Sequence, residues 1–249
     1  MKSFDRTSSI VLAWQAHKVF NDHVTQASVR PLRRRNTIFG GLIARLIPVV
    51  ESALLLFERQ YDGAGLDLTR SALEVHAWLH FVARHKSPYR AIRLASLQQE
   101  QKIIKSEHAL ALLKKKRAPG YLPLVSRLKR KIKTLEKAGI KDIGPTKRIE
   151  DMGPGYIALY RYLSAHAHHN LAALLAENFS VSNGKDEYIV GKCVDNVLLA
   201  RCLEALLLAE NFACAEGVRF APKAEKSSWI QAALDIKTIL EALQLRSHS

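Results

Sequence analysis

Helical periodicity is the feature that most limits the folds open to this chain of 249 residues. Apolar residues recur at intervals of three and four in consecutive N-terminal stretches, at residues 8–29, 37–60 and 66–84. Pro31 and the glycine-containing run 61–65 predict breaks between these stretches. Long helices joined by short connections pack antiparallel, so the chain is predicted to form an all-α helical bundle.

The positive charge is concentrated in one segment, residues 86–150. This segment carries 18 Lys and Arg against 5 Asp and Glu, a net charge of +13, in a chain whose total is +15. Its pattern predicts a basic helical hairpin that projects from the bundle, with helices over 91–116 and 122–138. We therefore predict a single helical domain over 1–249 with this hairpin as an insertion.

Such a density of cations predicts binding to nucleic acid through its phosphates, because bound phosphates release their counterions. The cations assigned to this role are Lys114, Lys115, Lys116, Arg117, Arg127, Lys129, Arg130, Lys131 and Lys133. Aromatic residues are sparse in the segment, so a platform that stacks single-stranded bases is not expected. A dense charge run is also typical of a helix face that only meets water, and this alternative stays open.

The C-terminal half continues the helical pattern. Helices are predicted over 156–178, 194–215 and 227–245. Between the first two, residues 179–191 predict one small β-hairpin with Asn183 and Gly184 at its turn.

Composition excludes several classes of protein. The cysteines are odd in number and lack the paired spacing of a zinc site, so we expect buried thiols in a reducing compartment, at Cys193, Cys202 and Cys214. The N-terminus shows no export signal, and Arg45, Pro48 and Glu51 interrupt the apolar window 39–57. We expect a cytoplasmic protein with no membrane partner, no metal and no cofactor, since nucleotide-binding and metal motifs are missing.

One helix concentrates polar side chains. Steps of four residues advance about 40° around a helix, so Tyr156, Tyr160, Ser164 and His168 form one stripe, with Arg161 at its edge. Arg161 and His168 are two turns apart, which makes them a candidate catalytic or anion-binding pair. A structural role for the same side chains is the alternative.

An earlier helix offers a partner for this stripe. Arg70 and Glu74 are four residues apart in apolar surroundings, so we predict a buried ion pair near Ser164 or His168. The full predicted polar network is Glu51, Arg70, Glu74, Tyr160, Ser164, His166, His169 and Asn170. His76 and His80 fall on another face and are predicted to be solvated.

These motifs resemble a bacterial all-helical family catalogued as a domain of unknown function. The resemblance covers residues 37–215 and rests on Arg70-x3-Glu74 and on Tyr160, Arg161, Ser164 and His168 at their spacing. The family often has proline after its motif histidine, whereas this chain has His169.

The chain also resembles the HEPN superfamily, many of whose members are metal-independent ribonucleases with an Arg-x(4–6)-His motif at a dimer interface. The resemblance implies Arg161 as the phosphate-stabilising cation and His168 as the general acid and base, in a ribonuclease or RNA-targeting toxin or defence protein. Arg161-x4-His166 fits the same pattern, so the identity of the histidine stays open. A homodimer would suit such a site and the apolar surplus of the 194–215 helix. The alternative is a non-catalytic nucleic-acid-binding or interaction module.

Overall fold

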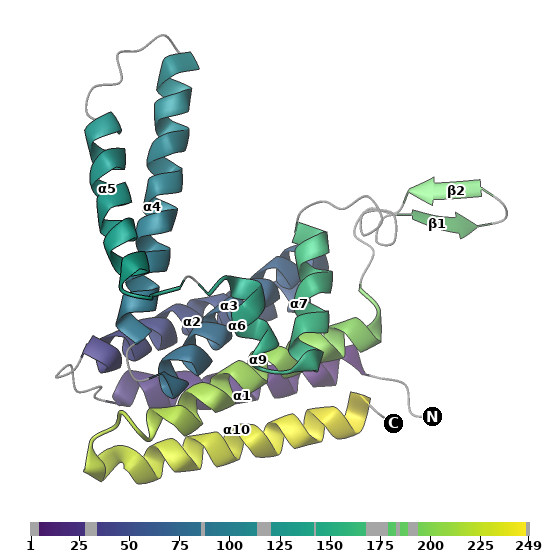
Figure 1. Cartoon of the computed structure of the whole chain (residues 1–249). Coiled ribbons are helices and arrows are strands. Elements are labelled where there is room, and N and C mark those ends of the chain that lie inside the picture. Colours follow the sequence, from purple (N-terminus) through teal and green to yellow (C-terminus); the bar gives the residue numbers. More distant parts are fainter. Residues whose placement is uncertain are drawn as a thin grey trace. The chain divides into compact units, whose positions relative to one another are not determined.

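The computed structural model describes residues 5–27, 34–85, 88–113, 121–141, 143–167, 179–182, 185–188 and 194–247 (Figure 1). The predicted all-α helical bundle is confirmed, with one two-stranded β-hairpin beside it. The helices are α1 (Arg6–Gln26), α2 (Arg34–Glu58), α3 (Asp62–Arg84), α4 (Pro88–Leu113), α5 (Tyr121–Lys137), α6 (Pro145–Glu150), α7 (Pro154–Ala167), α9 (Asn196–Gly217) and α10 (Lys226–Ser247), with a short 3-10 turn at Lys223–Glu225.

The small β-hairpin consists of β1 (Phe179–Ser182) and β2 (Lys185–Tyr188). The strands are antiparallel, with Phe179 opposite Tyr188. They fall within the predicted range of 179–191.

The chain divides into two compact units, which we describe separately. The first contains residues 1–84 and 145–249, and the second contains residues 85–144. The hairpin is therefore shorter than the predicted 86–150. The last six residues of the predicted segment, 145–150, form α6 instead. This helix packs on α3 and α7, with Arg148 and Ile149 buried.

The first unit is organised around α9, which packs against α1, α3 and α10 (Figure 1). Its buried residues, among them Leu203, Leu206 and Ala213, lie on more than one face of the helix. Helix α1 contributes the small residues Ala13 and Ala16, which allow close approach between helix axes. Asp5 and Asp195 cap α1 and α9 by accepting hydrogen bonds from backbone N–H groups.

Helix α3 begins at Asp62, earlier than the predicted 66, so the glycines of the 61–65 run are helical and not a break. Gly65 is required by packing: a Cβ atom there would lie 2.6 Å from Cε1 of Phe57 on α2. The turn before α3 instead uses Gln60, whose φ of 61° lies in the left-handed region.

Within the described residues, one helix segment is long and apolar enough to cross a membrane, Thr37–Glu58 of α2. About a third of its apolar window is buried, on the side that carries Phe39, Ile43, Leu46 and Phe57. Length and composition are weak evidence for a span, because a core helix passes the same test. Here α2 packs extensively against α3, as the predicted antiparallel pair requires.

The second unit is the helical hairpin of α4 and α5. A single apolar stripe holds it together, with Leu94, Leu97, Leu128 and Ile132 buried and Ile104, Leu135 and Ile140 packed around them. Residues 85–144 carry 16 Lys and Arg against 4 Asp and Glu, a net charge of +12, which leaves +3 for the rest of the chain.

Candidate functional site

The cations of α5 cover the whole side of the helix that faces solvent. Leu128 and Ile132 mark the buried side, and the positive side chains occupy an arc of about 200° opposite them at 100° per residue. All six are exposed, and none forms an ion pair with a described residue: Arg127, Lys129, Arg130, Lys131, Lys133 and Lys137. We name these six residues the α5 cationic face.

Helix α4 adds cations that were not assigned from the sequence. Arg90, Arg93, Lys102 and Lys105 are exposed. The predicted binding residues Lys114, Lys115, Lys116 and Arg117 lie outside the described residues. Exposed apolar side chains also occur on the hairpin, at Ile103, Leu110, Leu122 and Leu124.

The predicted polar network is present in part, between α3 and α7. Arg70 Nη2 lies 3.4 Å from Glu74 Oε1, and the Tyr160 hydroxyl donates a hydrogen bond of 3.0 Å to the same oxygen. The Arg70 guanidinium carbon lies 5.7 Å from the centre of the Tyr160 ring. The predicted burial of this ion pair is only partial, because the side chains of Arg70 and Glu74 are 24% and 37% exposed at the edge of the helix interface.

The other predicted members of the network are dispersed. Glu51 is exposed and forms no ion pair with a described residue, so its predicted place in the network is wrong. Ser164 is half-buried, and its hydroxyl has no hydrogen-bond partner within the described residues. His166 Nδ1 lies 3.6 Å from Asp67 Oδ1, so its carboxylate neighbour is Asp67 and not Glu74. His168, His169 and Asn170 lie outside the described residues.

Arg161 points into solvent. Its side chain is 69% exposed, and Nη2 lies 3.7 Å from Glu150 Oε1. Tyr160 is its neighbour in the sequence but is buried against α3, since adjacent positions on a helix differ by about 100°. An exposed guanidinium with one weakly held carboxylate is chemically able to bind a phosphate group.

The predicted solvation of His76 and His80 is wrong. Both residues are buried, because α7 and α9 pack on that face of α3. The His76 ring lies between Tyr156 and Phe212, at centroid distances of 5.5 and 5.0 Å. Burial, with a smaller effect from His80, lowers the pKa of His76 to about 3, so the imidazole is neutral in the folded protein.

The structure also contains buried ionisable groups that the sequence did not indicate. His17 Nδ1 lies 2.6 Å from Glu210 Oε1, and this pair joins α1 to α9 in the core. Burial raises the pKa of Glu210, and the hydrogen bond and charge of His17 oppose that rise. On the α3–α6 side, the Arg148 guanidinium lies 3.7 Å from the centre of the Trp78 ring.

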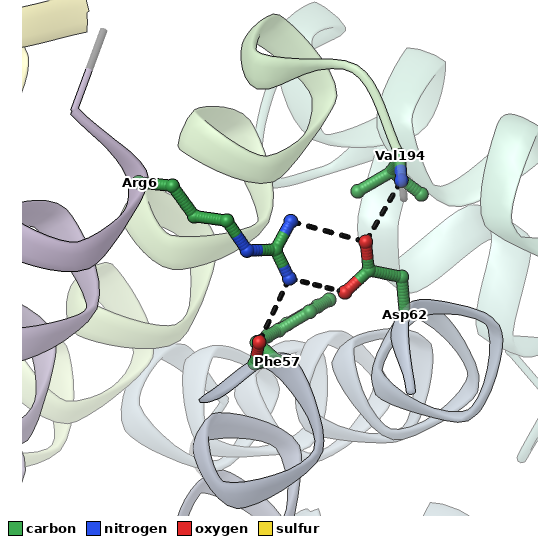
Figure 2. Close-up of polar contacts among 4 residues, drawn as sticks. All are labelled: Arg6, Phe57, Asp62 and Val194. Carbon is green, nitrogen blue, oxygen red and sulfur yellow. Dashed lines mark hydrogen bonds and ion pairs between the residues drawn. The ribbon is translucent and has the colours of Figure 1, made fainter. Parts of the chain in front are cut away.

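A second buried group links three distant parts of the first unit (Figure 2). Arg6 donates to both carboxylate oxygens of Asp62, at 2.5 and 3.1 Å, and to the Phe57 carbonyl oxygen at 2.7 Å. The backbone N–H of Val194 donates to Asp62 Oδ2 at 2.8 Å. We name these contacts the Asp62 clasp. Arg6 and Val194 are 56 and 132 residues from Asp62 in the sequence, and no local sequence pattern predicts contacts over such separations.

The thiols show no activated cysteine in the described part of the chain. Cys202 and Cys214 are free and buried, as predicted. Burial raises the pKa of Cys202 to about 12 and also raises that of Cys214, so both stay protonated at neutral pH. Cys193 lies outside the described residues. Among those that are described, no group of three or more His, Cys, Asp and Glu side chains could hold a metal ion.

Comparison with known proteins leaves the activity open. No curated protein and no solved structure matches the chain. A family description does match, over residues 36–187, which run from α2 through the basic hairpin and α7 to the β-hairpin. The likeness to a helical family of unknown function is thereby confirmed, whereas the likeness to the HEPN superfamily stays a prediction. On this match, which covers more than half of its length, the chain belongs to the Family of unknown function (DUF5677).

Proposed function

We propose that this protein binds nucleic acid, and RNA in particular, through the phosphate backbone, with the α4–α5 hairpin as the binding element. The observation that carries the proposal is the α5 cationic face, whose six exposed side chains form no ion pair with a described residue. Exposed cations that no ion pair holds are surrounded by water and mobile ions. Phosphates can therefore displace those ions at a gain in entropy.

The distribution of charge supports a dedicated binding element more than general solubility. Residues 85–144 hold a net charge of +12, and the remaining 189 residues hold +3. Solubility needs only a net charge of about 2 to 8 on a small domain, so the hairpin exceeds that need on its own. The cations lie on a helix face with few aromatic side chains, so we expect contacts to phosphates and little reading of bases.

The test is a salt titration of binding to a fluorescently labelled RNA duplex, with DNA duplex and single-stranded RNA in parallel. If about six cations contact phosphates, the slope of log K against log salt for the duplexes is near −5. The variant Lys129→Gln/Arg130→Gln/Lys133→Gln removes half of the α5 cationic face. We expect its slope to fall to about −3 and its affinity to drop for all sequences alike.

The matched control variant removes three exposed lysines of the first unit, as Lys223→Gln/Lys226→Gln/Lys237→Gln, and is expected to bind normally. Equal loss in both variants would show that only net charge matters and would contradict the proposal. Vesicles of anionic phospholipid form a further arm, because the hairpin exposes Leu110 and Leu122 beside its cations. Tighter binding to vesicles than to RNA would assign the hairpin to a membrane surface instead.

We propose, second, that the bound RNA is cleaved without a metal ion. The observation favouring this activity is the exposed Arg161 side chain, which is free to approach a phosphate beside Glu150. In this reaction Arg161 stabilises the charge on the phosphate, and His168 takes the proton of the attacking 2′-hydroxyl and returns one to the leaving oxygen. His166 is the alternative candidate for the residue that accepts and returns the proton.

Cleavage of labelled RNA in excess chelator tests this activity. We expect Arg161→Ala and His168→Ala each to lower the rate at least about 100-fold. Glu74→Gln serves as the control, because it disturbs the Arg70–Glu74–Tyr160 contacts without touching Arg161. No cleavage by the wild-type protein, with binding intact, would favour a non-catalytic module in which these contacts are only structural.

A further inference from the structure

Helices α7 and α9 enclose an apolar surface that the core of the first unit does not use. Two hollows of about 310 and 320 Å³ lie along these helices, and Leu159 and Arg201 line both of them. Between them the hollows extend from Val197 to Leu208 of α9, about 16 Å at 1.5 Å per residue. Val197 is 65% exposed there, and Tyr162 of α7 is 41% exposed. A surface of this length fits a helix.

The side chains that α9 presents to this surface follow a regular order. Val197, Arg201, Glu204 and Leu208 line the hollows at spacings of four, three and four residues. This spacing is that of the seam of two packed helices. The intervening residues Leu199, Cys202, Leu203 and Leu206 are fully buried within the protomer. Helix α9 thus has a second seam in addition to its core face.

The order of residues along this seam is the same in both directions. An apolar residue stands at each end, and a cation and an anion stand in the middle. If two copies of α9 cross antiparallel about a two-fold axis between Cys202 and Leu203, Val197 meets Leu208 of the partner subunit. The same operation places Arg201 opposite Glu204 of the partner subunit, and it does so twice.

We infer that a second copy of this chain docks on the α7–α9 surface, with α9 antiparallel to α9 of the partner subunit. The order of Arg201 and Glu204 along α9 favours a second copy of the chain as the occupant. An unrelated helix would have to supply an acid and a base in the matching positions, whereas a second copy supplies them by symmetry. Arg201 is exposed and Glu204 is half-buried, and both line the same hollow, so both reach the surface that a second copy would cover. Leu159 and Tyr162 of α7 flank the seam and add apolar area.

Charge reversal on the full-length protein tests this register. Sedimentation velocity at micromolar concentration should show a dimer for the wild-type chain. Arg201→Glu places two like charges opposite each other at both pairs, and so does Glu204→Arg, so each variant should dissociate at least about 100-fold more readily. When the two variants are mixed, every acid again faces a base, and a heterodimer should form. The double variant Arg201→Glu/Glu204→Arg should dimerise alone.

Mixing the two variants also distinguishes charge repulsion from misfolding. A heterodimer forms only if both variants are folded, so its appearance shows that each single variant failed to dimerise because of its charges. Lys237→Glu on α10 is the matched control, and it should dimerise like the wild type. A wild-type monomer at about 100 μM would overturn the inference. A dimer that persists in both single variants would also overturn it, because the contact would then lie elsewhere.

Discussion

The two units of this protein use charged side chains in opposite ways. In the first unit, ionisable side chains are built into the packing: Arg6 contacts Asp62, His17 contacts Glu210, and Arg148 contacts the Trp78 ring. In the hairpin, the side chains of the α5 cationic face are exposed and have no ion pair within the described residues. A buried charge needs its partner, and losing that partner is costly, whereas a solvated charge contributes little to folding. Stability and binding should therefore be separable by mutation.

The largest expected effect comes from the Asp62 clasp. Asp62→Asn removes the charge that faces Arg6 and weakens the acceptor for the Val194 N–H, while both groups stay largely buried. We expect a loss of about 4 kcal/mol in the free energy of unfolding, measured by urea denaturation. Asp151→Asn is the control, because it breaks an exposed pair with Lys147 and should cost far less. Equal losses would break the contrast between buried and exposed charges.

The next effect tests the packing of the first unit without changing charge. Gly217→Ala places a Cβ atom into the ring of Trp229, which is 2% exposed and cannot move aside. We expect a loss of about 3 kcal/mol, measured by thermal and urea unfolding. Gly41→Ala on α2 is the matched control, because nothing lies within 4 Å of its added Cβ. That control should stabilise the protein by about 0.5 to 1 kcal/mol through helix propensity.

His76 predicts a dependence of stability on pH. Its pKa is about 3 in the folded protein and about 6.5 when unfolded, so the unfolded state binds the extra proton between these values. Stability is therefore fully present above pH 6.5 and is lost as the pH falls toward 3. Between pH 7 and pH 5 this group should cost about 2 kcal/mol, measured by urea denaturation at each pH.

His76→Leu should remove that part of the pH dependence, since leucine does not titrate. A wild-type slope equal to that of His76→Leu would show that the ring is already charged or hydrated in the folded state.

The smallest effect on stability is expected where the effect on binding is greatest. The variant Lys129→Gln/Arg130→Gln/Lys133→Gln should change the free energy of unfolding by less than about 0.5 kcal/mol, because these side chains are exposed and unpaired within the described residues. Chemical denaturation of the whole protein measures this change. A large loss of stability would mean that the α5 cationic face is held by contacts within the protein, and the two units would then not differ as described.

The helices could be predicted from the sequence because their signals are local. Apolar spacing placed α1, α2, α9 and α10 to within a few residues, and the Asn-Gly dipeptide preceded a true β2 strand. The predicted start of α3 is too late, because a glycine can either end a helix or allow close packing within one. The glycines of residues 61–65 predict a break, whereas Gly65 lies within α3 and makes room for the Phe57 ring.

The site was less predictable because its contacts depend on tertiary packing. The Arg70–Glu74 pair follows from helical spacing, and the link to Tyr160 lies where the stripe on α7 suggested. The burial of His76 and His80 did not follow, since it depends on α7 and α9 covering a second face of α3. The Asp62 clasp could not be predicted for the same reason. Arg6, Asp62 and Val194 are far apart in the sequence, and no periodic pattern relates their positions.

The Asp62 clasp also has a consequence for synthesis on the ribosome. Its third member, Val194, is translated well after Asp62, and α1 needs both α9 and α10 to cover its buried side. At about 5 to 20 residues per second, the 132 residues from Asp62 to Val194 take roughly 7 to 26 seconds to emerge. During that interval the apolar sides of α1 and α2 lack their final partners, while the hairpin needs only neighbouring residues. We therefore expect the nascent chain to expose these apolar sides until α9 has emerged.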